Sequence, residues 1–323
     1  MKRIKSRILL MVSIIGILLV NPAKGIGETP AVEFLLEWGQ HGADSGEFDQ
    51  PIGIAVDSAG YVYVSDSGND RIQKFSNNGE FISSWGHKGS KINDLDIPMH
   101  MTMDINNNLY VAEYGNDRVQ KFTSEGKALM SFGETGKGKG KFDAPSGVAV
   151  DKSGNIYVTD FYNHLVHKFS PEGKFLIQIG EPGQVDSGKL HYPTDVSVGM
   201  DGNIYVADAY NNRIQVFSPK GEFVNKWGGP SGRGDAGNSK GWFNVATGIG
   251  IDGGGRVYVA DFENHRIQIF ERDGNFITSF GKQGTGKGEF ERPTDVAVDN
   301  QGNVFVVDWG NDRIQKFSIR WEN

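Results

Sequence analysis

Short apolar runs alternate with polar turns along most of the chain. In the first such unit, Ile52–Val56 is apolar, Asp57–Gly60 has the composition of a turn, and Tyr61–Ser65 alternates aromatic and β-branched residues. Two further runs, Arg71–Phe75 and Phe81–Trp85, follow after Gly-containing polar segments. These are the signals of short strands joined by turns. Because no segment keeps a 3.6-residue apolar period, the pattern predicts an all-β protein with almost no helix.

The unit of four runs recurs six times. Its third run carries an Asn-x-Arg-like motif, and the Asn recurs at intervals of 47, 47, 48, 53 and 47 residues. A fixed period of this length with four strand-like runs is typical of a propeller blade. The sequence therefore predicts a six-bladed β-propeller with four-stranded antiparallel blades. The repeats begin near Phe48, Leu95, Phe142, Leu190, Phe243 and Phe290.

The two ends of the repeat array complement each other. The sixth repeat stops at Phe317 without a fourth run, whereas residues 32–39 (VEFLLEWG) match fourth runs such as Glu80–Gly86 (EFISSWG). We therefore expect the N-terminal strand to complete the last blade beside Arg313–Phe317. Such closure leaves the ring without an exposed sheet edge.

The first 25 residues have a different character. Basic residues between positions 2 and 7 precede an apolar run of 13 residues, Ile8–Val20, and small residues follow at Ala23 and Gly25. The run is shorter than the roughly 20 residues that span a bilayer. We expect a signal peptide at 1–25 and a propeller at 26–323, in a protein that is secreted to an extracellular or periplasmic space. An uncleaved signal anchor is the alternative.

Composition narrows the classes of partner and chemistry. The absence of Cys excludes disulfides, thiolate metal sites and cysteine nucleophiles. The formal charge of −7 becomes −12 when residues 1–25, with five basic and no acidic residues, are removed. Such a charge disfavours nucleic acid as a partner, because clustered basic residues supply most of that affinity. With no second apolar stretch of spanning length, we expect no transmembrane span after signal cleavage, and a monomer.

The repeats resemble those of the NHL-repeat family. The resemblance rests on P-x-[GD]-[IV]-A-V-D, [IV]-Y-V-x-D and N-x-R-I-Q-x-F motifs in six copies, and it covers about residues 32–317. It implies the propeller fold but only weakly a function. The family includes RNA-binding and protein-binding propellers of tripartite-motif ubiquitin ligases, extracellular propellers of unknown ligand, and the peptidyl-α-hydroxyglycine α-amidating lyase. Because a RING-like Cys/His cluster is absent, the ligase class is excluded.

Residues present in every blade are expected to be structural, because each blade needs them for the same reason. Asp66, Asn69 and Arg71, with their equivalents, are expected to hold the turn between the second and third strands. The Arg is expected to pair with a carboxylate or carbonyl of a neighbouring blade. A site for a single ligand must break this symmetry.

One symmetry-breaking position lies two residues after the residue that opens each blade. His100, Asp195 and Asp295 occupy it in three blades, and Gly occupies it in the other three. We expect these three side chains at one end of the central channel, where they could hold Ca²⁺ or Zn²⁺. The alternative is a water-filled channel with solvated polar groups. No other cofactor is expected.

The resemblance to the lyase fails at its metal site. That enzyme places three zinc-binding His directly after the blade-opening Pro, a position that exists in all six repeats. None of the six residues here is His, and we assign no catalytic residue on this basis. They are Ile52, Met99, Ser146, Thr194, Thr247 and Thr294.

Aromatic residues recur in the loop after the second strand in five of the six blades. Aromatic side chains give large contact areas with little loss of entropy. With the polar channel residues beside them, they have the composition of a ligand site. The alternative is that they cover the ends of the blade cores. These candidates are Tyr114, Phe161, Tyr162, Tyr210, Phe262 and Trp309.

Two functions remain open on the sequence. The first is a non-enzymatic binding propeller that recognises a protein, peptide or glycan at one mouth of the channel. The second is a metal-dependent lyase or hydrolase with its site at the channel mouth. Metal content of the purified protein would separate the two.

Overall fold

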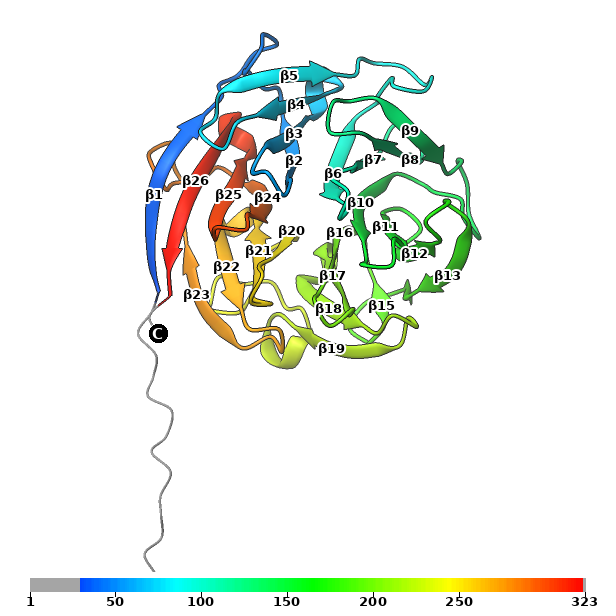
Figure 1. The fold of residues 1–323 in the computed structure, drawn as a ribbon. Coiled ribbons are helices and arrows are strands. Elements are labelled where there is room, and N and C mark those ends of the chain that lie inside the picture. Colours follow the sequence, from blue (N-terminus) through cyan, green and yellow to red (C-terminus); the bar gives the residue numbers. More distant parts are fainter. Residues whose placement is uncertain (1–29, 322–323) are drawn as a thin grey trace, which may run out of the picture.

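The computed structural model describes residues 30–321 of the chain. These residues form six four-stranded antiparallel sheets, which surround a central channel like the blades of a propeller (Figure 1). The predicted six-bladed, all-β fold is therefore confirmed. None of the helices in this part of the chain is long and apolar enough to cross a membrane. The expected signal peptide at 1–25 lies outside the described residues.

Each blade has four strands from the channel outwards, and in blades one to five they follow in chain order. The channel strands are β2 (Pro51–Val56), β6 (Pro98–Met103), β10 (Pro145–Val150), β16 (Pro193–Val198), β20 (Ala246–Ile251) and β24 (Pro293–Val298). The second strands are β3 (Val62–Asp66), β7 (Leu109–Glu113), β11 (Ile156–Asp160), β17 (Ile204–Asp208), β21 (Val257–Asp261) and β25 (Asn303–Asp308). The third strands are β4 (Arg71–Phe75), β8 (Arg118–Phe122), β12 (Leu165–Phe169), β18 (Arg213–Phe217), β22 (Arg266–Phe270) and β26 (Arg313–Arg320). The outer strands are β5 (Phe81–Trp85), β9 (Ala128–Phe132), β13 (Phe175–Ile179), β19 (Phe223–Trp227), β23 (Phe276–Phe280) and β1 (Ala31–Trp38). A two-stranded parallel pair, β14 (Glu181–Pro182) and β15 (Lys189–Leu190), lies in the loop that enters blade four.

The burial of the strands explains their composition. Second strands such as β3 and β17 are buried at every position, because both faces of the sheet pack on neighbouring blades. The outer strand β13 instead alternates between covered and exposed residues. Each hydrophobic cluster joins two adjacent blades: Tyr63 and Ile72 of blade one, for example, pack with Leu109 of blade two. The core is thus a ring of six inter-blade contacts.

The N-terminal strand closes the ring, as expected. Strand β1 pairs antiparallel with β26, from Ala31 opposite Arg320 to Trp38 opposite Ile314. It is therefore the outer strand of blade six (Figure 1). Blade six is shared by the two ends of the described chain.

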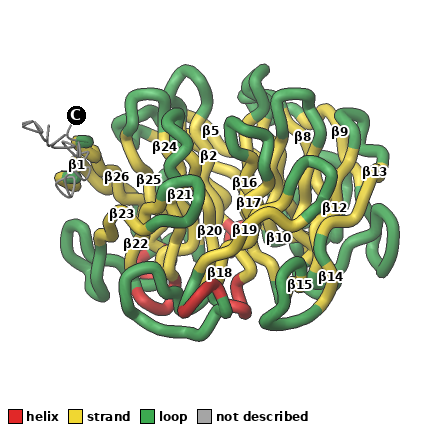
Figure 2. Tube along the Cα trace, turned by 90° about the horizontal axis from the view of Figure 1, so that it is seen from below, coloured by secondary structure: helices red, strands yellow, loops and turns green. Residues whose placement is uncertain are grey.

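Short 3₁₀ turns mark one face of the disc. They gather on one side in Figure 2. We call this side the turn face and define it by the segments between second and third strands: residues 67–70, 114–117, 161–164, 209–212, 262–265 and 309–312. We call the opposite side, with residues 57–61 and their equivalents, the hairpin face. The 3₁₀ turns are η1 (Ser67–Asn69), η2 (Ala209–Asn211), η3 (Pro230–Gly232), η4 (Phe262–Asn264) and η5 (Trp309–Asn311), of which η3 lies in the loop between blades four and five.

A repeated hydrogen bond links each blade to the next on the turn face. The last residue of each turn segment is left-handed, and its side chain accepts the backbone N–H of the residue that precedes the next blade's first strand. The acceptor and donor are 2.8–3.1 Å apart in all six cases. We call these bonds the blade latches. The pairs, with the accepting side chain first and the residue that donates its backbone N–H second, are Asp70 and Ile97, Asp117 and Ala144, His164 and Tyr192, Asn212 and Val245, His265 and Arg292, and Asp312 and Gln50.

Candidate functional site

The residues common to all blades are scaffold, and blade four shows how they work. The buried Asp208 accepts hydrogen bonds from Arg213 Nε (2.8 Å) and Asn211 Nδ2 (2.9 Å). It also accepts the backbone N–H of His191 (2.7 Å), while Arg213 Nη1 donates to the carbonyl of Val185 (2.6 Å). The Arg thus fixes the loop that enters its blade. The expectation was a carboxylate or a carbonyl of a neighbouring blade. The carboxylate is wrong, because Asp208 belongs to the same blade as Arg213, and the carbonyl lies in the loop that joins blade three to blade four.

The structure brings His100, Asp195 and Asp295 together at the start of three channel strands. Their donor atoms lie within 4.8 Å of one another, and the residues are only 3%, 5% and 3% exposed. His100 Nδ1 is 3.2 Å from Asp295 Oδ2 and 4.0 Å from Asp195 Oδ2. Neither contact has hydrogen-bond geometry, and this buried nitrogen has no hydrogen-bond partner. The three residues, which we call the channel trio, form a closed cluster rather than an open mouth.

Backbone amides of the following blades hold both carboxylates of the trio. Asp195 Oδ2 accepts the N–H of Ile249 (2.8 Å), and Asp295 Oδ2 accepts the N–H of Ile54 (2.9 Å). The first bond joins blade four to blade five, and the second joins blade six to blade one. The orientation of the two carboxylates is therefore fixed by the blade packing.

Glycine in the other three blades makes room for the trio. A Cβ atom at Gly147 would lie 2.6 Å from the Cα of Asp195, and one at Gly248 would lie 2.4 Å from Asp295 Oδ1. Packed atoms do not approach so closely, so a larger residue at either position would displace the trio. Small and large residues therefore alternate around the ring, and only three side chains meet on the axis.

Burial and mutual attraction shift the titration of the trio. Burial alone disfavours the imidazolium, but attraction to Asp195 and Asp295 outweighs it and raises the pKa of His100 to about 9. Burial raises the pKa of Asp195 to about 7; His100 opposes that change and Asp295 adds to it. The two acids thus favour the imidazolium form of His100, and they repel each other.

Two hollows lie below the trio, toward the hairpin face. One of about 170 Å³ in the channel is lined by the trio's two carboxylates and by apolar residues of the channel strands, Val148 and Ile249 among them. Another of about 530 Å³ opens at the hairpin face over blades three to six, lined by residues that include Asp151 and Lys168. The ligand-binding residues predicted from the sequence all belong to the turn face and the channel entrance. Nothing in the repeat pattern indicated the hollow at the hairpin face.

Four of the six predicted aromatic residues lie in one cluster on the turn face. The rings of Phe161 and Tyr162 are 5.0 Å apart, and the hydroxyls of Tyr114 and Tyr162 form a 2.8 Å hydrogen bond across two blades. Tyr192 lies between Phe161 (4.9 Å) and Tyr210 (5.0 Å). We call Tyr114, Phe161, Tyr162, Tyr192 and Tyr210 the aromatic patch. Tyr162 is 44% exposed and Tyr210 55% exposed, so the patch faces solvent across blades two to four.

The other two predicted aromatics form a separate pair. The rings of Phe262 and Trp309 are 5.9 Å apart, and the guanidinium of Arg292 lies 5.8 Å from the Phe262 ring. Both rings are half-buried, so this pair over blades five and six offers less surface than the aromatic patch does.

Two protein-family models match parts of the chain. The NHL repeat matches residues 48–75, 142–169 and 190–217, and a family described as a 6-bladed beta-propeller matches residues 250–321. These segments lie in blades one, three, four, five and six of the ring. The chain is a six-bladed β-propeller that contains NHL repeats. No protein with a curated description matches its sequence.

Solved structures share the fold of this NHL-repeat propeller at low identity. A Bacteroides thetaiotaomicron protein of unknown function is 18% identical, with a TM-score of 0.70 over 90% of this chain and 76% of its own. A streptogramin B lyase is 15% identical, with a TM-score of 0.61 over 90% of this chain and 98% of its own. A Xanthomonas campestris gluconolactonase is 15% identical, with a TM-score of 0.63 over 91% of this chain and 98% of its own. At such identities the likeness concerns the fold alone.

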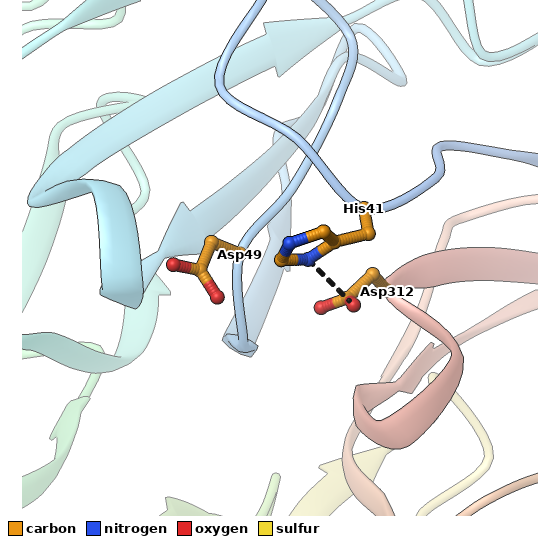
Figure 3. Close-up of side chains that lie close together, drawn as sticks. All are labelled: His41, Asp49 and Asp312. Atoms are coloured by element: carbon orange, nitrogen blue, oxygen red, sulfur yellow. Dashed lines mark hydrogen bonds and ion pairs between the residues drawn. The ribbon is translucent and has the colours of Figure 1, made fainter.

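A second group of His and Asp side chains lies on the turn face of the propeller (Figure 3). His41 Nδ1 is 3.1 Å from Asp312 Oδ2, and Asp49 lies beside them. Other blades place Lys88 or Thr135 at the position of His41, each close to the equivalent latch carboxylate. The His41 side chain is also 73% exposed. This group is therefore one version of a contact that the repeats share.

The sequence interpretation missed Tyr192, the centre of the aromatic patch, and the two His that pack on it. His164 and His191 lie 4.3 Å and 4.7 Å from the Tyr192 ring, measured between centroids. Tyr192 precedes the blade-opening Pro193 and so lies outside the loop between second and third strands that carries the predicted aromatics. Comparing that position between repeats would have found it, since the other five carry Gln50, Ile97, Ala144, Val245 and Arg292.

Proposed function

We propose that this protein is a non-enzymatic recognition module that binds a protein, peptide or glycan on its turn face. The observation that supports this best is the aromatic patch. Its rings come from three blades, and two of its tyrosines expose about half of their surface to solvent. The repeat scaffold does not require these rings, because blade one places Ser67 and Gly68 at the same position.

The patch has the physical character of a recognition surface. Phe161 and Tyr192 fix the arrangement from below through ring contacts, so that Tyr162 and Tyr210 are held in place before a ligand arrives. Little side-chain entropy is then lost on binding. Tyr rings stack on apolar faces while their hydroxyls form hydrogen bonds, which suits both sugar rings and peptide side chains.

The test compares ligand binding between the intact protein and patch variants. Fluorescently labelled protein is applied to a glycan array and to a displayed random-peptide library, and affinities are measured for the strongest hits. Tyr162→Ala and Tyr210→Ala are each expected to weaken binding about tenfold or more, because central aromatics dominate interface energies. Trp309→Ala, in the separate pair, is expected to weaken it less.

The matched control is Tyr61→Ala, which removes an exposed tyrosine from the hairpin face. Affinity should stay unchanged in this variant. Loss of binding in the control, together with unchanged affinity in both patch variants, would place recognition on the hairpin face and contradict the proposal.

The second candidate function is metal-dependent lyase or hydrolase chemistry in the channel. The composition of the channel trio favours it, and a lyase and a lactonase share the fold. Against it, the trio is almost completely covered, whereas a substrate must touch the reacting groups. We therefore place recognition first, and we propose that it takes place outside the cytoplasm, on the strength of the signal-like residues 1–25.

A further inference from the structure

The channel trio is arranged as a set of ligands rather than as a hydrogen-bonded network. A direct His–Asp hydrogen bond needs a distance of about 2.7–3.2 Å and a suitable angle. The two distances from His100 Nδ1 are 3.2 Å and 4.0 Å, and neither contact has that geometry. Donors bound at about 2.1 Å to one ion are instead separated by roughly 3 to 4.2 Å, depending on the coordination geometry. The observed distances fall within this range.

The charges of the trio point in the same direction. Two carboxylates and one imidazole are buried together, and in residues 30–321 no Lys or Arg nitrogen lies within 4 Å of either carboxylate. With both carboxylates ionised and a neutral imidazole, the group carries a net charge of −2. A divalent cation with a neutral imidazole gives zero, and buried charge is tolerated only when it is compensated.

The surroundings of the trio support ligand roles. Each carboxylate oxygen nearest His100 also accepts a backbone N–H, from Ile249 or from Ile54. Hydrogen bonds of this kind orient metal-binding carboxylates. The Nδ1 atom of His100 is buried without a hydrogen bond and lies within 4.0 Å of both of these oxygens. Beside both carboxylates, the channel hollow of about 170 Å³ has room for water ligands that complete the coordination.

We propose that His100, Asp195 and Asp295 form a buried site for a divalent first-row metal ion such as Zn²⁺, which ties blades two, four and six together at the propeller axis. One imidazole with two carboxylates suits Zn²⁺ or Mn²⁺ better than Ca²⁺, which prefers six to eight oxygen ligands. Because the site is closed to large molecules, its role is to stabilise the ring. This role is independent of recognition at the aromatic patch.

The experiment uses the purified full chain, stripped with a chelator and then dialysed against Zn²⁺. We expect one bound ion per chain by elemental analysis, and a melting temperature several degrees higher than that of the stripped protein. Asp195→Asn, Asp295→Asn and His100→Gln should each lower Zn²⁺ affinity by at least about a hundredfold, beyond the effect of losing a supporting hydrogen bond. The control is His41→Ala, which removes a histidine from the exposed group and should leave the affinity unchanged.

A spectroscopic measurement covers the case in which a variant fails to fold. Co²⁺ added to the stripped wild-type protein should give visible absorption typical of a four- or five-coordinate ion with a nitrogen ligand. The proposal is overturned if the wild-type protein binds no Zn²⁺ and shows no such Co²⁺ spectrum, or if folded trio variants keep the ion. A failure of this kind leaves the patch variants' binding results untouched, so the two proposals fail separately.

Discussion

At the scale of single residues, the molecule separates what every blade needs from what one blade adds. Asp208, Asn211 and Arg213 form a buried network whose geometry recurs in blades one, five and six. Blade three lacks the Arg and has Leu165 instead; there His167 Nε2 lies 3.2 Å from the buried Asp160. In blade three the imidazole of His167 thus contacts the buried carboxylate that a Gln and an Arg contact in blade four.

The buried pair of blade four gives a residue-scale prediction. Arg213→Leu copies the side chain found in blade three but leaves Asp208 buried without a cation, so we expect a loss of about 3–5 kcal/mol in the free energy of unfolding. Urea denaturation measures it. Lys141→Ala is the control, because Lys141 and Glu134 form a solvent-exposed pair, and its effect should stay within about 0.5 kcal/mol. Equal effects in the two variants would show that the buried network does not stabilise the blade.

The same comparison of blades shows how far the sequence predicts the site. Symmetry-breaking residues could be found by aligning the repeats, and Tyr114, Tyr162 and Tyr210 do lie together as a result. Tyr192 was not predicted, because it lies in the loop that enters blade four and not in the loop between the second and third strands. The closed state of the channel trio could not be predicted, since it depends on how near the axis the channel strands approach, which Gly147 and Gly248 permit.

At the scale of elements, the blade latches show how the blades are held in register. Four latches use a carboxylate or amide oxygen as acceptor, but His164 and His265 use Nδ1. An oxygen accepts the N–H bond throughout the neutral and mildly acidic range. A ring nitrogen accepts it only while it is unprotonated.

The latch of blade three should therefore weaken in acid. Burial lowers the pKa of His164, and the neighbouring His191 and Lys137 lower it further against an opposing effect of Asp160. The folded state thus favours the neutral ring. The His164 latch therefore stabilises the fold fully above the ordinary His pKa of about 6.5. This stabilisation is lost as the pH falls through the lowered pKa that His164 has in the folded protein.

Two reciprocal variants test this pH dependence. His164→Asn provides an acceptor at every pH and tolerates the left-handed backbone, as Asn212 does in blade four. Between pH 8 and pH 5 its melting temperature should fall by a few degrees less than that of the wild type. The melting temperature of Asn212→His should fall by more than that of the wild type over the same pH range. If all three proteins show the same pH profile, protonation of the latch does not affect stability.

At the scale of the whole molecule, the fold could be predicted from the sequence because the sequence is periodic. Six copies of one pattern, with strand-like runs and Gly turns at fixed places, left little freedom in blade number or strand order. Function could not be read in the same way, because repetition specifies a scaffold and says nothing of its ligand. Neither the repeat pattern nor low-identity neighbours such as the lyase and the lactonase decide between recognition and catalysis.

Closure by the N-terminal strand gives the last prediction. Val32 and Phe34 of β1 pack into the cluster between blades five and six, and Trp38 packs into the cluster between blades six and one. Deleting residues 26–40 exposes both clusters and the edge of β26, so we expect aggregation or a large fall in melting temperature. Trp38→Ala alone should cost about 2–4 kcal/mol in urea denaturation.

The outward-facing Leu35 of the same strand provides a control, and Leu35→Ala should cost less than about 0.5 kcal/mol. A synthetic peptide of residues 30–40, added to the truncated protein, should restore much of the lost stability by pairing with the open edge of β26. A truncated protein that melts at the wild-type temperature, with no response to the peptide, would mean that β1 does not hold the ring closed. Restoration would show that closure depends on strand pairing and not on a covalent link between β1 and the first blade, because the peptide has no such link.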